Sequence, residues 1–165
     1  GRFGAFSVTG KAMKPLLTLL AAVALLAGKQ VAAGEIEDAC TDLVLDYAIH
    51  RDRLDADSYA KLFAADAVLS VLDDRFVGRD AIHERLVESR GKETTRHLMS
   101  TIRITVEDEE NATGISYVRI YASPAGDLPM TAAQKVVGEY HDRFVRTADG
   151  WKISERKFVP VFMEE

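Results

Sequence analysis

The sequence predicts an α+β fold in which helices come first and long antiparallel strands come last. From Glu35 onward, apolar residues recur at helical spacing. The last third of the chain has the pattern of long β segments, and Asp149-Gly150 is a strong hairpin signal between the final two. Because the helices precede the run of long strands, we expect the helices to pack on one face of a curved sheet.

Three helices are expected before the long strands. The first is expected to end near Asp52. Its apolar stripe comprises Ile36, Cys40, Leu43, Val44 and Tyr47. A second, short helix extends to residues 62–63, and Asp55 or Asp57 can cap it, because a carboxylate accepts the free amides of a first turn. A third helix begins around Asp80.

The β segments begin with a hairpin between the second and third helices, turning at Asp73-Asp74. Its two strands are expected at residues 68–72 and 76–77, and the longer strands at residues 98–106, 112–121, 135–146 and 151–161. Alternating side chains along each strand point to opposite faces, so one face of the sheet can cover the helices.

A hydrophobic segment near the N-terminus has the pattern of a secretory signal peptide. Lys14 precedes an apolar run over residues 16–27, and the small residues Val31-Ala32-Ala33 follow. The run is shorter than the roughly 20 residues that a membrane-crossing helix needs, so we expect cleavage after Ala33 and no permanent membrane anchor. Residues 1–12, ahead of Met13, do not belong to this pattern.

The signal-peptide interpretation divides the chain into an N-terminal extension with a leader, residues 1–33, and one folded domain, residues 34–165. It predicts an exported protein, periplasmic or secreted. The alternative is an amphipathic or buried N-terminal helix in a cytoplasmic protein.

Length, charge and cysteine content exclude several classes of protein. A chain of 165 residues is long enough for one domain with a core. The net charge of -5 is shared between both signs, and no basic run is interleaved with aromatic residues, so no nucleic acid partner is expected. Cys40 is the only cysteine, which excludes an internal disulfide and a cysteine-built zinc site.

Neither a metal site nor a cofactor is expected. The histidines at positions 50, 83 and 141 have no second histidine or acid at ligand spacing. The sequence also lacks a Gly-rich phosphate loop and a nucleophile elbow. Any catalysis is therefore expected to be cofactor-free.

The order of several short motifs resembles the SnoaL-like branch of the nuclear-transport-factor-2-like superfamily. The motifs are Tyr47-Ala48, Asp52, Asp55, Leu62-Phe63, Asp66-Ala67, Gly78-Arg79-Asp80-Ala81-Ile82, Arg96-His97 and Gly150-Trp151-Lys152-Ile153. The resemblance covers almost everything after the leader. It implies a cone-shaped α+β barrel, in which a strongly curved, mostly antiparallel sheet wraps around N-terminal helices and encloses a pocket for a small apolar ligand.

The resemblance also suggests a catalytic pair, Asp52 and His97. In dehydratase-like and dehydrochlorinase-like members, an aspartate at the end of the first helix and a histidine opening a central strand form a dyad inside the cone. An imidazole can accept a proton from carbon near neutral pH, and a buried carboxylate fixes its tautomer. We expect the carboxylate to raise the pKa of His97. On the residues alone, Asp52 would be a solvated turn residue and His97 a strand histidine at the sheet margin.

Further pocket residues are expected on the first helix and on two strands. Tyr47 lies five residues before the aspartate, as in related bile-acid dehydratases, and could polarise a substrate oxygen. It also lies on the apolar stripe, where an aromatic residue is usually core. Tyr117 and Arg119 on one strand, and Tyr140 on the next, are candidate substrate-binding residues. Strand alternation does not say which face points inward.

The resulting hypothesis is a cofactor-independent, dehydratase-like lyase or isomerase that acts on a small hydrophobic, cyclic molecule through an Asp–His dyad. The alternative is a non-catalytic, exported domain of the same fold that binds a small ligand or associates with itself. The resemblance implies homodimers or homotrimers, formed through apolar strand positions such as Val118 and Ile120. The superfamily hosts many chemistries, so the substrate stays open.

Overall fold

The computed structural model describes the backbone of residues 14–164 and the side chains of residues 32–164. Residues 1–13, which include Met13 and the segment ahead of it, lie outside the described residues. The chain divides between Gly34 and Glu35 into two units, of which the second carries the sheet and is described below. Within residues 14–164, no helix is long and apolar enough to cross a membrane.

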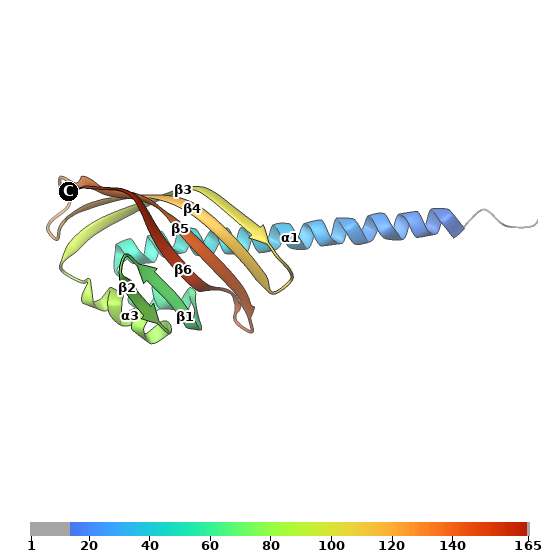
Figure 1. Cartoon of the computed structure of the whole chain (residues 1–165), viewed down its shortest axis with the longest axis horizontal. Helices are drawn as coiled ribbons and strands as arrows, with labels where there is room; N and C mark the ends of the chain where they lie inside the picture. Colours follow the sequence, from blue (N-terminus) through green and yellow to red (C-terminus); the bar gives the residue numbers. More distant parts are fainter. Residues whose placement is uncertain (1–13, 165) are drawn as a thin grey trace, which may run out of the picture. The chain divides into compact units, whose positions relative to one another are not determined.

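Within residues 14–164, three helices form in the predicted order (Figure 1), although the first helix begins well before the predicted start at Glu35. They are α1 (Lys14–Arg53), α2 (Ala56–Lys61) and α3 (Arg79–Glu88). The apolar stripe of α1 is buried as expected, with Cys40, Val44 and Tyr47 each at most 2% exposed. Asp55 caps α2, since its Oδ1 accepts a hydrogen bond from the Ser58 N–H at 3.1 Å.

In the part of the chain that the structure describes, six strands form one curved, unclosed sheet in the order β2-β1-β6-β5-β4-β3. The strands are β1 (Phe63–Val71), β2 (Asp74–Val77), β3 (Glu93–Val106), β4 (Asn111–Pro124), β5 (Ala133–Thr147) and β6 (Gly150–Met163). All neighbours are antiparallel except β1 and β6. The expected α+β class and the mostly antiparallel sheet are therefore confirmed.

Residues 62–63 are a correction to the predicted second helix. This helix ends at Lys61, and Phe63 instead begins β1 and pairs with Ile153 of β6. The Leu62 carbonyl accepts a hydrogen bond from the Ile153 N–H at 2.9 Å. Pairing with a strand 90 residues later in the sequence thus overrides the local helical pattern.

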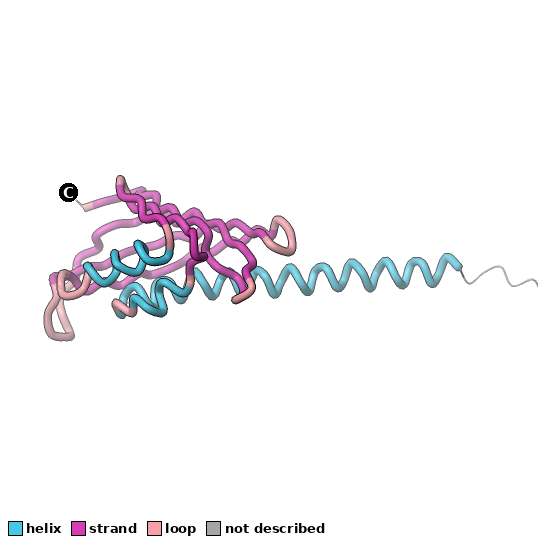
Figure 2. The backbone as a smooth tube through the Cα atoms, turned by 90° about the horizontal axis from the view of Figure 1, so that it is seen from below, coloured by secondary structure: helices cyan, strands magenta, loops and turns pink. Residues whose placement is uncertain are grey.

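The helices cover one face of the sheet, which we call the inner face; Figure 2 shows helices and strands as separate layers. Its buried side chains include Val118, Val136, Tyr140, Phe144, Ile153 and Phe158. Val118 is fully buried within this one chain, so the prediction that it remains uncovered for self-association is wrong. Side chains at the intervening strand positions form the outer face, away from the helices.

Candidate active site

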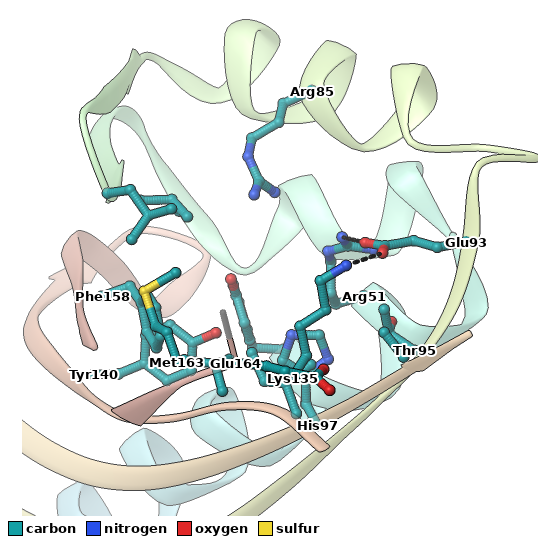
Figure 3. A pocket seen from close by; sticks show the side chains of 16 residues that line it. Arg51, Arg85, Glu93, Thr95, His97, Lys135, Tyr140, Phe158, Met163 and Glu164 are labelled. Carbon is teal, nitrogen blue, oxygen red and sulfur yellow. Dashed lines mark ion pairs between the residues drawn. The ribbon is translucent and has the colours of Figure 1, made fainter. Parts of the chain in front are cut away.

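A cavity of about 500 Å³ opens on the inner face of the sheet (Figure 3). Its apolar walls include Val71, Ile120, Val136 and Phe158. Polar side chains from α1, α3, β3 and β5 also line it, namely Tyr47, Arg51, Arg85, Thr95, His97 and Tyr140. A cavity of this size and composition fits a small, largely apolar molecule held by a few polar groups.

Asp52 and His97 form a hydrogen-bonded pair at this cavity. Asp52 lies in the last turn of α1, and His97 lies on β3 and lines the cavity. Asp52 Oδ1 lies 2.6 Å from His97 Nδ1, and Asp52 Oδ2 accepts a hydrogen bond from the His97 main-chain N–H at 2.8 Å. The two side chains are 10% and 6% exposed, respectively. The two side chains therefore lie within hydrogen-bond distance of each other, as predicted.

Thr95, two residues before His97 on the same face of β3, completes the surroundings of the carboxylate. Its hydroxyl donates to Asp52 Oδ1 at 2.9 Å. Burial alone would raise the pKa of Asp52, but the hydrogen bonds and charge of His97, with the hydrogen bond from Thr95, lower it below its ordinary value. Asp52 is therefore an anion near neutral pH.

The pKa of His97 is a correction to the sequence-based expectation. Burial lowers this pKa below its ordinary value of 6.5 and outweighs the Asp52 carboxylate, which raises it. The charges of Arg51 and Arg85 lower it further. His97 is therefore neutral near pH 7. Because Nδ1 faces a carboxylate, the ring proton belongs on Nδ1, and Nε2 keeps a free lone pair.

Tyr47 contacts both His97 and Arg156, and Arg156 forms an ion pair with Asp142. Its ring packs edge-on against His97, with ring centres 6.4 Å apart, and the Arg156 guanidinium carbon lies 4.0 Å from the Tyr47 ring centre. Burial would raise the pKa of Tyr47, but the charges of Arg156 and then Arg85 lower it below its ordinary value. A hydroxyl with a lowered pKa is a stronger hydrogen-bond donor, as a group that polarises oxygen requires.

Arg156 is held by Asp142 across β5 and β6. Its Nε and one terminal nitrogen donate to the two Asp142 oxygens at 2.7 Å each, and both side chains are fully buried. Arg156 was not among the predicted site residues. The Asp149-Gly150 hairpin alone would place Asp142 opposite Glu155, and a register shift between Arg143 and Phe144 places it opposite Arg156 instead.

Of the three predicted substrate-binding residues, only Tyr140 lines the cavity. Tyr117 is 45% exposed and Arg119 is exposed, and both lie on the outer face of β4. The prediction of pocket contacts for Tyr117 and Arg119 is therefore corrected. The reason is the pleat: Val118 and Ile120 take the inner face of β4, so their neighbours point the other way.

Five charged cavity residues were also missed: Arg51, Arg85, Glu93, Lys135 and Glu164. Charged residues on a helix or a strand end usually face solvent, and no short motif marks these as pocket residues. For residues 14–164, no group of three or more histidine, cysteine, aspartate or glutamate side chains is arranged to hold a metal ion.

A curved, mostly antiparallel sheet over N-terminal helices is the architecture that the resemblance to the nuclear-transport-factor-2-like superfamily implies. The model of the SnoaL-like domain family matches residues 33–157, and the chain belongs to this family. No curated protein matches the sequence.

Solved structures share the fold at low sequence identity. A provisionally assigned scytalone dehydratase from Novosphingobium aromaticivorans is 23% identical, with a TM-score of 0.71 over 82% of this chain and 90% of that one. The hexachlorocyclohexane dehydrochlorinase LinA type 2 is 15% identical, with a TM-score of 0.73 over 82% and 91% of the two chains. A Mycobacterium tuberculosis protein of unknown function is 23% identical, with a TM-score of 0.66 over 76% of each chain. The fold is thus shared with dehydratase-like and dehydrochlorinase structures.

Proposed function

We propose that this chain is a cofactor-independent lyase or isomerase that removes an acidic C–H proton from a small hydrophobic, cyclic molecule. The observation that carries the proposal is the 2.6 Å pair of His97 and Asp52 at a cavity of about 500 Å³. A neutral imidazole whose proton is fixed on Nδ1 presents Nε2 as a base. Such a base contributes about 10²- to 10⁴-fold in rate.

In a lyase step, Nε2 of His97 takes the proton, and the C–H electron pair forms a C=C bond as hydroxide or another leaving group departs from the adjacent carbon. The proton then passes from His97 to a departing hydroxide, which leaves as water. In an isomerase step, the electron pair moves onto a carbonyl oxygen, and His97 returns the proton to a different carbon. In both cases Asp52 stabilises the imidazolium, and Tyr47 donates to the oxygen that gains charge.

Hydrogen–deuterium exchange tests this proposal without a known physiological substrate. Cyclic ketones and cyclic β-hydroxyketones are incubated with the protein in D₂O, and exchange of the acidic C–H is followed by proton NMR. We expect at least one compound to exchange faster with the wild type, and His97→Gln to abolish the acceleration. His141→Gln is the matched control, because His141 is an exposed histidine on the outer face.

The same experiment separates the enzyme from the binding domain of the alternative hypothesis. Compounds that bind in the cavity without any His97-dependent exchange would contradict the catalytic proposal. Equal exchange by the wild type and His97→Gln would contradict it as well. In either case, the non-catalytic ligand-binding function would replace it.

Export is a second part of the proposal, supported by Lys14, the apolar run over residues 16–27 and Val31-Ala32-Ala33. Expression in a bacterial host should give a periplasmic protein that begins near Gly34. Intact-mass measurement of the periplasmic fraction tests this. An uncleaved cytoplasmic product would favour the cytoplasmic alternative.

Self-association is the third part, now proposed through the outer face instead of through Val118. This face exposes Leu98, Ile115 and Tyr117, which are 46%, 43% and 45% exposed, on the adjacent strands β3 and β4. Apolar side chains grouped in this way favour a symmetric dimer or trimer. Light scattering at micromolar concentration tests this, and a monomer would contradict it.

A further inference from the structure

Three cationic side chains line the cavity in addition to the Asp–His pair. Arg85 enters it from α3, Arg51 from the last turn of α1, and Lys135 from β5 (Figure 3). The acids that line it are Glu93 on β3 and Glu164, whose side chain is exposed near the C-terminus. The distribution of these charges over their partners decides what the cavity can bind.

Arg85 has the least complete set of partners. One terminal nitrogen of its guanidinium is buried without a hydrogen-bond partner, and no ion pair within residues 32–164 includes this residue. Its guanidinium carbon lies 5.2 Å from the Phe76 ring centre, a contact that supports the cation from one side. A buried N–H of a cation without an acceptor is unfavourable, so a bound acceptor would stabilise it.

Arg51 and Lys135 share a single carboxylate. Arg51 is 7% exposed, and its terminal nitrogen lies 3.9 Å from one Glu93 oxygen. Lys135 lies 3.9 Å from the other Glu93 oxygen. Both separations exceed the roughly 2.7–2.9 Å of a charge-assisted hydrogen bond. Arg51 and Lys135 thus have Glu93 within ion-pair distance, whereas Arg85 has no carboxylate at that distance among residues 32–164.

The field of these two arginines reaches the dyad. Their charges lower the pKa of His97, and the charge of Arg85 also lowers the pKa of Tyr47. Arg85 and His97 line the same cavity, so a small molecule whose anionic group binds at Arg85 would place its remainder in the space that His97 lines. The apolar walls formed by Ile120, Val136 and Phe158 would contact that apolar remainder.

We propose that Arg85, assisted by Arg51, binds a carboxylate group, so that the ligand of this cavity is a small hydrophobic carboxylic acid and not a neutral molecule. A planar carboxylate can accept two parallel hydrogen bonds from one guanidinium, which matches an arginine with an unpartnered nitrogen. The identification of this acid as a substrate rests on the proposed proton abstraction; its binding does not.

Paired probes test the inference by binding alone. Benzoate, cyclohexanecarboxylate and 2-naphthoate are each compared with the corresponding uncharged amide by isothermal titration calorimetry on the full chain. We expect the wild type to bind at least one carboxylate about tenfold more tightly than its amide, the preference that one charge-assisted contact gives. Equal affinity within every pair, or no carboxylate binding in any pair, would overturn the inference.

Three variants assign the preference to Arg85. Arg85→Met should remove it, and Arg85→Lys should restore part of it, since the charge returns without the planar fork. Arg119→Met removes the same charge from the outer face and should leave the preference unchanged. If a folded Arg85→Met protein still prefers the carboxylate over the amide, the assignment of this preference to Arg85 is overturned. If Arg85→Met does not fold, the comparison of carboxylate with amide in the wild type decides the inference.

The two proposals can fail separately. If His97→Gln still prefers the carboxylate over the amide and the wild type shows no exchange, the anion site is supported and catalysis is contradicted. If exchange depends on His97 but occurs only with neutral ketones, and no carboxylate is preferred over its amide, the anion site is overturned and catalysis is supported.

Discussion

Two buried carboxylates in this domain are each hydrogen-bonded to a basic side chain, but in different surroundings. Asp142 and Arg156 are fully buried and joined by two hydrogen bonds of 2.7 Å each. Asp52 and His97 are joined by a hydrogen bond between side chains at the edge of a cavity. Both pairs contact Tyr47, Arg156 through the face of its ring and His97 through its edge.

The two pairs differ in the charge of the basic side chain near neutral pH. Burial would lower the pKa of Arg156, but Asp142, Tyr47 and Tyr140 raise it further above its ordinary range, so this residue stays charged at every accessible pH. The pKa of His97 is lowered, so it is neutral near pH 7 and can accept a proton. The first pair therefore fixes the structure and the local field, whereas the second can take part in proton transfer.

Removing one partner of the fully buried pair should have the largest effect on stability. Asp142→Ala leaves the Arg156 guanidinium buried without its counter-charge, which costs about 3–5 kcal/mol in free energy of unfolding. Urea denaturation followed by circular dichroism measures this. The double variant Asp142→Ala/Arg156→Met should recover most of the loss, and a double variant as unstable as the single one would contradict this account of the pair.

Asp52→Asn should change activity far more than stability. The amide keeps the shape, but only its one oxygen can accept, so a hydrogen bond to the second oxygen is lost and the free energy of unfolding should fall by about 1–2 kcal/mol. The proton-exchange rate should fall by about 10²- to 10⁴-fold, because the imidazolium loses its counter-charge and the tautomer is no longer fixed. Exchange assays and denaturation on the same preparation check both effects. Unchanged exchange would contradict the role of Asp52.

The pH dependence of exchange should show the smallest but most specific effect. Neutral His97 is the active form, so exchange is lost as the pH falls through its pKa, which lies below 6.5. The wild type should therefore still be active at pH 6.5. Among the charged groups acting on His97, Asp52 raises this pKa, whereas Arg51 and Arg85 lower it. Arg85→Met should shift the acidic limb to higher pH, and Asp52→Asn should shift it to lower pH.

An acidic limb above pH 6.5 in the wild type would contradict the balance between burial and attraction. Arg119→Met is the control for the Arg85 variant, because it removes an outer-face charge and should leave the limb in place.

The fold class was predicted from local periodicity, and the Asp52–His97 pair was predicted from the family resemblance. The stripe from Ile36 to Tyr47 places α1, and the motif order indicates the family, whose pattern carries the two site positions. The inward face of β4 could not be predicted, because strand alternation is symmetric until a packed layer selects one side. Tyr117 and Arg119 were therefore assigned to the wrong face.

The lowered pKa of His97 and the charges in the cavity depend on tertiary structure in the same way. Whether burial or a carboxylate dominates for His97 depends on how much water the folded cavity excludes. Arg85 comes from a helix whose other residues give no sign that this arginine faces a pocket. Arg156 is a further case, since a register shift between Arg143 and Phe144, which the turn at Asp149-Gly150 does not predict, places it opposite Asp142.

Nitrogen NMR of His97 tests the central claim most directly, because it measures where the imidazole proton lies. The account predicts that at pH 7 the ring of the wild type is neutral, with the proton on Nδ1 toward Asp52 and an unprotonated Nε2, and that it titrates below 6.5. His97→Gln assigns the signal. A ring that is protonated at pH 7, or that carries its proton on Nε2, would contradict the assignment of His97 as the base.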